Sequence, residues 1–367
     1  MENIKVLLVE DNETAIQQFK MNLSEFNSEN TNYCIDETIV ENYEQALKVI
    51  DKTFDAIILD LALNQNHQGG NDIAKKLEEN NIRVPILFVS GNHGNVQENP
   101  LIISKRSRDD GDYEDDFYKI LEVYKTGLTN ILGGRGEIEK KLSEIFKNTV
   151  IPELEVWIKY ALDDTTDLKQ TEKALLRLVV NHLTHLLEDD EMLSYPEEFY
   201  VYPVKDEVLR TGTLLKSKKT DDFYISLSPA CDLAQHNGKC KTDRLLIAEI
   251  EPITNIKNAI YEALKDQQEG PKKRRNIEKQ LSSYFNNNYS NYYHSLPKIQ
   301  KFPGGFINFR KAKSLTEEEV ENDYEIKDIQ ISSPFVKDIL SRFSSYYARQ
   351  GQPVILFDHH IRELIEA

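Results

Sequence analysis

Residues 54–63 decide the fold of this chain and read Phe-Asp-Ala-Ile-Ile-Leu-Asp-Leu-Ala-Leu. This apolar run, with Asp60 near its C-terminal end, is typical of a fully buried parallel strand. Ligands of open α/β sheets bind beyond the carboxyl ends of the strands, so Asp60 stands where a reactive carboxylate is useful. Taken alone, Asp60 could equally be an aspartate that caps the next turn. The neighbouring strands decide between these two interpretations.

Strand-like and helix-like patterns alternate on both sides of this stretch. Further strands are predicted at residues 4–9, 33–40, 84–89 and 101–103. Helical spacing of apolar residues follows the first three strands, and Asn12 is placed to cap the first helix. Right-handed β-α-β crossovers wind such a chain into a parallel sheet. The fold class predicted for the first third is therefore α/β, a doubly wound five-stranded parallel sheet with helices on both faces.

Polar side chains stand at the ends of four of these strands. They are Glu10 and Asp11, Asp60, Ser90, and Lys105. Three carboxylates on neighbouring strands repel one another unless a hard divalent cation lies between them, and Mg²⁺ suits such an oxygen-rich site. With Mg²⁺ bound, Asp60 can attack a phosphoryl group because the metal neutralises the transferring oxygens. A lysine ammonium can hold a phosphoryl oxygen, and a serine hydroxyl can donate to another.

On these residues, positions 1–125 resemble the receiver domain of two-component response regulators. In that family the acidic pair after the first strand binds Mg²⁺, the aspartate after the third strand is phosphorylated, and a Ser or Thr and a Lys follow. The matching positions here are Glu10, Asp11, Asp60, Ser90 and Lys105. The resemblance also implies that Ala62 offers its backbone carbonyl to the metal and that a sensor histidine kinase or phosphotransfer protein supplies the phosphoryl group. The alternative is a scaffold with an inactive receiver.

Three departures from the family pattern affect its usual output surface. Ser90 and Lys105 are only 15 positions apart, roughly two helical turns short. Residues 91–100 lack helical apolar spacing, so the fourth helix is expected to be short or absent. Ile102 stands where the family has an aromatic switch residue, and Arg106 follows Lys105 where the family has proline. Dimerisation through the usual receiver face is therefore not expected.

Residues 126–194 are predicted to form a helical connector after a helix at 115–132. Residues 133–136, Gly-Gly-Arg-Gly, lack the Gly-Lys-Ser/Thr of a phosphate loop and favour a hinge. Amphipathic helices follow, and a connector of this kind transmits a signal or mediates homo-oligomerisation. His182 and His185 share one helical face, where ordinary helix histidines are favoured over metal ligands because no third ligand is evident.

Residues 195–367 are predicted to form a mixed α/β effector domain built on a small antiparallel barrel. Short strands are expected at 199–202, 212–216, 223–227, 245–250, 306–309 and 354–357, with a helix at 334–347. Residues 224–233 look like a Ser-Pro-x-Cys-Asp-Leu element of uncharacterised bacterial proteins. Those proteins form SH3-like barrels distantly similar to growth-inhibitor toxins of the PemK type. The resemblance implies an SH3-like barrel over 196–357, and it does not indicate a particular chemical activity.

Four side chains in this domain suggest two possible chemical sites. Cys231 next to Asp232 could be a thiol nucleophile, but an adjacent carboxylate disfavours the thiolate. Cys231, His236 and Cys240 could be zinc ligands, although their spacing fits no standard knuckle and a fourth ligand is missing. A buried cysteine beside a turn-forming aspartate is the favoured interpretation.

A basic segment interrupts the same domain. Residues 265–313 carry eleven Lys and Arg against three Asp and Glu, with tyrosines interleaved. The cluster Lys272, Lys273, Arg274 and Arg275 is compatible with single-stranded nucleic acid, and hence with a receiver-gated, ribonuclease-like enzyme. A long solvated loop, or a surface that docks on the acidic remainder of the chain, is favoured over nucleic acid.

Composition sets the outer limits of function. A net charge of −17 argues against a whole-molecule binder of nucleic acid or membrane, and no apolar run approaches membrane-spanning length. Three cysteines suit a reducing cytoplasm, and Met1 leads directly into a strand without a signal peptide. The expectation is a cytoplasmic signalling protein phosphorylated on Asp60, with no pattern of a helix-turn-helix transcription factor.

Overall fold

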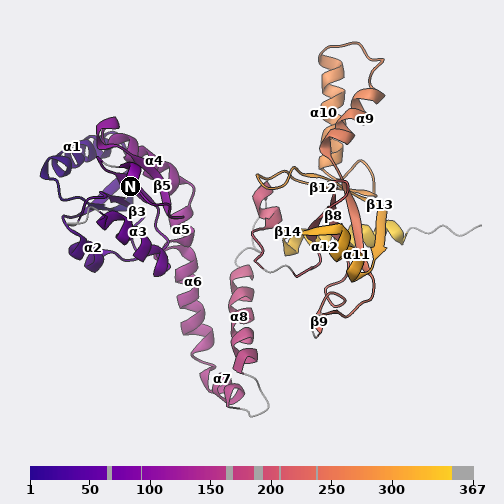
Figure 1. Ribbon diagram of the computed structural model, residues 1–367, viewed down its shortest axis with the longest axis horizontal. Coiled ribbons are helices and arrows are strands. Elements are labelled where there is room, and N and C mark those ends of the chain that lie inside the picture. Colours follow the sequence, from indigo (N-terminus) through magenta and orange to yellow (C-terminus); the bar gives the residue numbers. More distant parts are fainter. Residues whose placement is uncertain are drawn as a thin grey trace, which may run out of the picture. The chain divides into compact units, whose positions relative to one another are not determined.

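The computed structural model describes residues 1–63, 68–91, 93–162, 168–185, 193–205, 208–236 and 239–348 (Figure 1). The chain divides into two compact units, Met1–Asp190 and Glu191–Ala367, and each is described by itself. Within the described ranges, no helix combines the length and the apolar character needed to cross a membrane.

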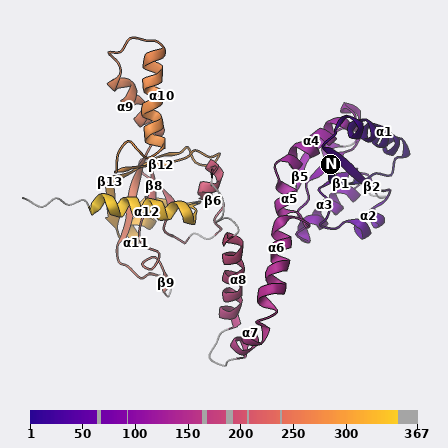
Figure 2. The ribbon, with the colours of Figure 1, turned by 180° about the vertical axis from the view of Figure 1, so that it is seen from behind.

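The first unit contains the predicted five-stranded parallel sheet. Its order is β2-β1-β3-β4-β5. The strands are β1 (Glu2–Val9), β2 (Tyr33–Val40), β3 (Ala56–Leu59), β4 (Ile86–Val89) and β5 (Ile102–Arg106). Four helices pack on this sheet, namely α1 (Glu13–Glu29), α2 (Tyr43–Val49), α3 (Gly69–Glu79) and α4 (Glu114–Lys125). Helices α1 and α4 contact each other, as do α2 and α3, and Figure 2 shows the two pairs from behind. The predicted fold class is confirmed.

Alternating residues of β1 explain why the sheet is covered on both faces. Val6 and Leu8 join the core that contains Phe117 of α4, whereas Leu7 and Val9 join a second core with α2 and α3. A strand buried on both faces must be apolar at every position, which is the pattern seen in the sequence. The Asn12 side chain accepts a hydrogen bond from the Ala15 amide at 3.1 Å and begins α1 as predicted.

The helix expected between β4 and β5 is reduced to a single turn. Among the described residues between β4 and β5, the helical structure is the 3₁₀ turn η1 (His93–Asn95). Asn71 of α3 holds this segment, donating to the Asn95 carbonyl at 3.2 Å and accepting from the Gln97 amide at 3.0 Å. The predicted shortening of this helix is confirmed.

The glycine-rich segment after α4 is attached to the first unit. The predicted helix at 115–132 is interrupted at Gly127, which has φ +79°, and resumes as α5 (Leu128–Leu132). The Gly134 amide then donates to the Lys52 carbonyl at 2.8 Å, and Arg135 pairs with the buried Asp55. These contacts fasten residues 133–136 to the sheet, so the segment is not the free hinge that its glycines predicted.

The described residues that follow α5 in the first unit, 137–162 and 168–185, are mostly helical, as the sequence predicts for the connector. The elements are α6 (Glu137–Ile145), the π-helical turn η3 (Phe146–Val150), α7 (Leu154–Ala161) and α8 (Leu168–His185). Helices α6 and α8 lie side by side, with α7 at the end of the pair (Figures 1 and 2). Glu139 of α6 pairs with Arg83 at 2.6 Å and with Lys52 at 3.3 Å, which joins this hairpin to the sheet.

The second unit is a mostly antiparallel half-barrel, as the predicted fold class requires. Its seven strands have the order β12-β13-β11-β8-β7-β14-β6. They are β6 (Tyr200–Val201), β7 (Thr213–Ser217), β8 (Phe223–Ser226), β11 (Leu245–Glu251), β12 (Tyr293–Leu296), β13 (Gly305–Leu315) and β14 (Tyr324–Ile331), and β9 (Gln235–His236) pairs separately with β10 (Lys239–Cys240). A closed SH3-like barrel stays a prediction, and the strand expected at 354–357 lies outside the described residues.

Helices complete the second unit. The 3₁₀ turn η4 (Pro196–Phe199) and the helices α11 (Glu317–Asp323) and α12 (Ser333–Tyr347) flank the sheet strands in sequence, and α12 confirms the helix predicted at 334–347. The basic segment 265–313 contains α10 (Pro271–Phe285), β12 and most of β13, so the prediction of a long solvated loop there is wrong. Helix α10 contacts the preceding α9 (Ile253–Ala263) and forms a helical hairpin with it. Pro271 occupies a first-turn position, where proline is tolerated because its missing N–H needs no partner.

Candidate functional site

Three carboxylates meet at the C-terminal ends of β1 and β3. The Asp60 amide donates to the Val9 carbonyl at 2.9 Å, which holds the two strand ends together. Oxygen atoms of Glu10, Asp11 and Asp60 all lie within 4.8 Å of one another. Glu10 is 1% exposed and Asp60 is 3% exposed, whereas Asp11 faces solvent. The structure therefore brings together the acidic residues that the sequence singled out.

The Asp60 carboxylate has one satisfied and one unsatisfied oxygen. Its Oδ2 accepts a hydrogen bond from the Ala62 amide at 3.0 Å. Its Oδ1 is buried and has no hydrogen-bond partner among the described residues, although an Arg108 nitrogen lies at ion-pair distance, 3.1 Å. A buried polar atom without a hydrogen bond is costly and calls for a physical explanation. An absent ligand of the carboxylate is one such explanation.

The charge balance of the site favours a further cation. Burial, followed by the charge of Asp60, raises the pKa of Glu10 to about 7, although the Asn12 amide and Arg108 act in the opposite direction. The Asn12 amide donates to Glu10 Oε1 at 3.0 Å. Three carboxylate side chains form the all-oxygen donor set that hard divalent cations prefer. The residues present therefore fit Mg²⁺, which Glu10, Asp11 and Asp60 would hold.

Arg108 is a site residue that the sequence did not reveal. Its Nη2 lies 2.6 Å from Glu10 Oε2 and 3.1 Å from Asp60 Oδ1. Arg108 begins the 3₁₀ turn η2 (Arg108–Asp110), which is capped reciprocally by Ser107 and Asp110. The guanidinium thus bridges two buried carboxylates from a loop that follows β5.

Arg106 builds the loop that carries Arg108. Its guanidinium donates to both oxygens of Asp116 in α4, with the shortest contact at 2.5 Å. It also donates to the carbonyls of Ser107, Gly111 and Asp112, so the β5–α4 loop wraps around one side chain. Arg106 stands where the family pattern has proline. This departure is the one sequence feature that indicates an unusual loop after β5.

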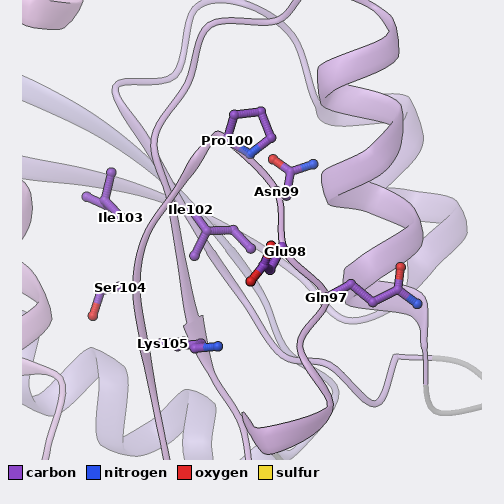
Figure 3. A pocket seen from close by; sticks show the side chains of 8 residues that line it. All are labelled: Gln97, Glu98, Asn99, Pro100, Ile102, Ile103, Ser104 and Lys105. Atoms are coloured by element: carbon purple, nitrogen blue, oxygen red, sulfur yellow. The ribbon is translucent and has the colours of Figure 1, made fainter. Parts of the chain in front are cut away.

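Among the described residues, no ion pair joins Lys105 to Glu10, Asp11 or Asp60. A register shift in β5 pairs Lys105 with Phe88, and its exposed side chain lines a surface cavity of ≈ 630 Å³ with residues such as Gln97 and Glu98. Figure 3 shows Lys105 and Ile102 extending toward Gln97 and Glu98, with Ile103 on the opposite side of the strand. The ion pairs of the described residues place Arg108, and not Lys105, against Asp60. The role assigned to Lys105 stays a prediction.

Ser90 and Ala62 occupy the positions that the sequence predicts. Ser90 is buried at the end of β4, next to β3, and its amide donates to the Arg106 carbonyl at 3.3 Å. Ala62 follows Asp60 by two residues and binds it through the amide. Whether Ser90 contacts a phosphoryl group, or the Ala62 carbonyl a metal, stays a prediction.

Gly70 allows α3 to approach the loop after Asp60. A Cβ at this position would lie 2.4 Å from the Asp60 carbonyl oxygen and 2.8 Å from the Phe88 ring. Real Cβ atoms do not approach backbone this closely, so Gly70→Ala must displace the strand end. We expect a loss of about 1–3 kcal/mol in the free energy of unfolding, measured by urea denaturation. Gly94→Ala, where a Cβ has open space, is the matched control. Equal stability of the two variants would contradict the close approach.

The candidate cysteine site of the second unit is only partly described. Cys231 is exposed, so the prediction of a buried cysteine is wrong, and its Sγ lies 3.5 Å from Asp232 Oδ1. Asp232 does lie in a turn, with its amide donating to the Pro229 carbonyl at 3.0 Å. Cys240 is half-buried, and the His236 side chain lies outside the described residues. Zinc binding by these three residues therefore remains untested.

The basic cluster of α10 does not form one surface. Lys273 is buried and pairs with Glu269 at 2.5 Å, and Arg274 pairs with Glu278 at 3.0 Å. Lys272, Arg274 and Arg275 are exposed, and the Arg274–Glu278 pair lies at the surface. Only Lys273 of the four basic residues is thus buried within the hairpin, and nucleic-acid binding stays a prediction.

Comparisons with known proteins find similarity at the level of solved structures. No family model matches the chain, and no curated protein matches it. A sensor protein from Polaromonas sp. JS666 has 20% identity and a TM-score of 0.27, over 33% of this chain and 94% of that one. Response regulator TrrA from Thermotoga maritima, solved with Mg²⁺-BeF, has 19% identity and a TM-score of 0.26, over 33% and 98%. The receiver domain of Francisella response regulator 1452 has 18% identity and a TM-score of 0.26, over 34% and 98%.

Proposed function

We propose that this chain is a response-regulator-type signalling protein in which Asp60 accepts a phosphoryl group. The observation that carries the proposal is the Asp60 carboxylate, which has an oxygen within 4.8 Å of oxygens of Glu10 and Asp11 and a buried Oδ1 without a hydrogen-bond partner among the described residues. An aspartate that merely caps a turn has no need of two further carboxylates beside it. A carboxylate with one oxygen fixed by an amide and the other held by an ion pair with Arg108 is suited to act as a nucleophile.

The chain's own residues prepare this nucleophile. The Ala62 amide fixes Oδ2 of Asp60 and leaves Oδ1 to attack phosphorus. A new O–P bond forms as the bond from phosphorus to the donor breaks, and the electron pair of that bond leaves with the donor. A Mg²⁺ ion held by Glu10, Asp11, Asp60 and the Ala62 carbonyl would neutralise charge on the phosphoryl oxygens. A histidine kinase or a phosphotransfer protein would be the physiological donor.

Arg108 is the residue that we expect to sense the phosphoryl group. A phosphoryl group on Asp60 adds negative charge next to the guanidinium, which now lies 2.6 Å from Glu10. Movement of Arg108 would shift η2, and the Arg106–Asp116 pair would pass this shift to α4. Along the chain, α4 is followed by α5 and the connector helices, which precede the C-terminal effector. Ser90 and Lys105 would assist at the ends of β4 and β5.

Removal of divalent cations tests the proposed function on the unmodified protein. We expect a small-molecule phosphodonor to add a single phosphoryl group in the presence of Mg²⁺, because three adjacent carboxylates repel an anionic donor without it. Intact mass spectrometry measures the adduct, and a chelator should abolish it. Failure to form an adduct with Mg²⁺ present would contradict the proposal and favour a receiver that serves only as a scaffold.

A further inference from the structure

At the carboxylate site and in the loop beside it, three buried polar atoms have no hydrogen-bond partner among the described residues. They are Asp60 Oδ1, Arg108 Nε and the hydroxyl oxygen of Tyr113. Buried polar groups are nearly always paired, so each unpaired group in a folded protein calls for a physical explanation. One acceptor and two donors left unpaired together indicate a ligand that would complete their hydrogen bonds.

Tyr113 stands at the end of the loop that carries Arg108. The guanidinium of Arg106, where this loop begins, lies 5.6 Å from the centre of the Tyr113 ring and donates to the carbonyl of Asp112. The other contact of the ring is with Phe19 of α1, at 5.2 Å between ring centres. The Tyr113 side chain is 2% exposed, so these contacts fix the ring and bulk water does not satisfy the hydroxyl.

The Tyr113 hydroxyl lies within the electrostatic field of the carboxylate site. Burial, followed by the charge of Glu10, raises the pKa of this hydroxyl, whereas Arg108 and Arg106 act in the opposite direction. The hydroxyl therefore keeps its proton at neutral pH and can donate a hydrogen bond. The Nε–H of Arg108 can only donate. Both unpaired groups beside Asp60 thus require an acceptor.

The chemistry of these donors selects the kind of ligand. Glu10 cannot easily serve both, because its Oε1 already accepts from the Asn12 amide and its Oε2 from Nη2 of Arg108. A divalent cation would satisfy the Asp60 carboxylate but offers no acceptor to an N–H or an O–H group. A phosphoryl group brings negative charge and three strong acceptor oxygens. It is the ligand that can satisfy both donors at once.

We propose that the Tyr113 hydroxyl and the Nε–H of Arg108 donate hydrogen bonds to oxygens of a phosphoryl group on Asp60. This inference rests on the proposed function and adds Tyr113 to it as a phosphoryl-binding residue. Tyr113 is also the residue at which α4 begins, since its carbonyl accepts from the Phe117 amide at 3.0 Å. A bond from the phosphoryl group to Tyr113 ties the start of α4 directly to the modified aspartate.

Beryllofluoride with Mg²⁺ is a suitable probe, because it mimics a phosphoryl group on an aspartate without a covalent donor. Isothermal titration calorimetry on the full chain measures its affinity. Tyr113→Phe removes only the hydroxyl and should weaken binding about 10-fold or more, as expected for the loss of one hydrogen bond to a charged group. The matched control is Tyr118→Phe, which removes an exposed hydroxyl from the same helix and should bind beryllofluoride as the wild type does.

The stability of the ligand-free protein should respond differently to the same substitution. Because the hydroxyl has no partner there, Tyr113→Phe should unfold at a urea concentration equal to or above that of the wild type. A lower midpoint would show that the hydroxyl is already hydrogen-bonded, and would overturn the proposal. Equal beryllofluoride affinity of wild type and Tyr113→Phe would overturn it and leave the proposed function intact. A wild type that does not bind beryllofluoride would contradict the proposed function, and this inference with it.

Discussion

Replacing Asp60 with Asn is expected to abolish phosphoryl incorporation completely. The amide is a poor nucleophile, so the side chain at position 60 can no longer form a bond to phosphorus. The variant should still fold, since Asp60 lies in a group of like charges and raises the pKa of Glu10 through repulsion. Removal of its charge relieves that repulsion, although it also weakens the contact with Arg108.

The control for this variant is Asp109→Asn. Asp109 is an exposed carboxylate next to Arg108 in η2, so the substitution removes one negative charge from the same loop. Intact mass spectrometry should show the phosphoryl adduct on the wild type and on Asp109→Asn but not on Asp60→Asn. Adduct formation on Asp60→Asn at the wild-type level would show that another carboxylate is the acceptor.

Replacing Arg108 with Ala is expected to destabilise the metal-free protein by about 3 kcal/mol. The substitution leaves the buried Glu10 and Asp60 without their cation, and breaking a buried pair by removing one partner costs about 3–5 kcal/mol. The lower end of that range applies because Arg108 is 27% exposed. Urea denaturation without divalent cations measures the effect.

Mg²⁺ should stabilise the Arg108→Ala variant more than it stabilises the wild type. In the wild-type protein a cation at the three carboxylates must compete with Arg108, whereas in the variant it meets no competitor. Arg274→Ala is the matched control, because its exposed pair with Glu278 is expected to contribute at most about 1 kcal/mol. Equal effects of Mg²⁺ on wild type and Arg108→Ala would contradict the shared site.

The sheet and the carboxylates could be predicted because their signals are local. Apolar runs such as 54–63 are buried on both faces, and the residue after each strand necessarily lies at the carboxyl edge. The positions of Glu10 and Asp60 could therefore be predicted without knowing any contact distant in the sequence. The reduced fourth helix was also visible, because residues 91–100 have no apolar face to bury.

Arg108 could not be predicted in the same way. Its position depends on a loop folded around Arg106, whose partners Asp116 and Gly111 follow no periodic pattern. Lys105 was the natural candidate from the family order, yet its side chain lines a surface cavity and forms no ion pair with the carboxylates among the described residues. Helix α10 was not predicted for a different reason. Its Lys and Arg residues were interpreted as a charged loop, although both residue types are good helix formers and Pro271 suits a first helical turn.

Reductive trapping of the phosphorylated residue tests the central claim most directly. Borohydride reduces an aspartyl phosphate to homoserine, and peptide mass mapping then identifies the position among the aspartates of the chain. After treatment with a phosphodonor and Mg²⁺, we expect homoserine at position 60 and no homoserine in the sample treated with chelator. Homoserine at another position, or none in a sample that carries a phosphoryl adduct, would contradict the assignment of Asp60 as the phosphoacceptor.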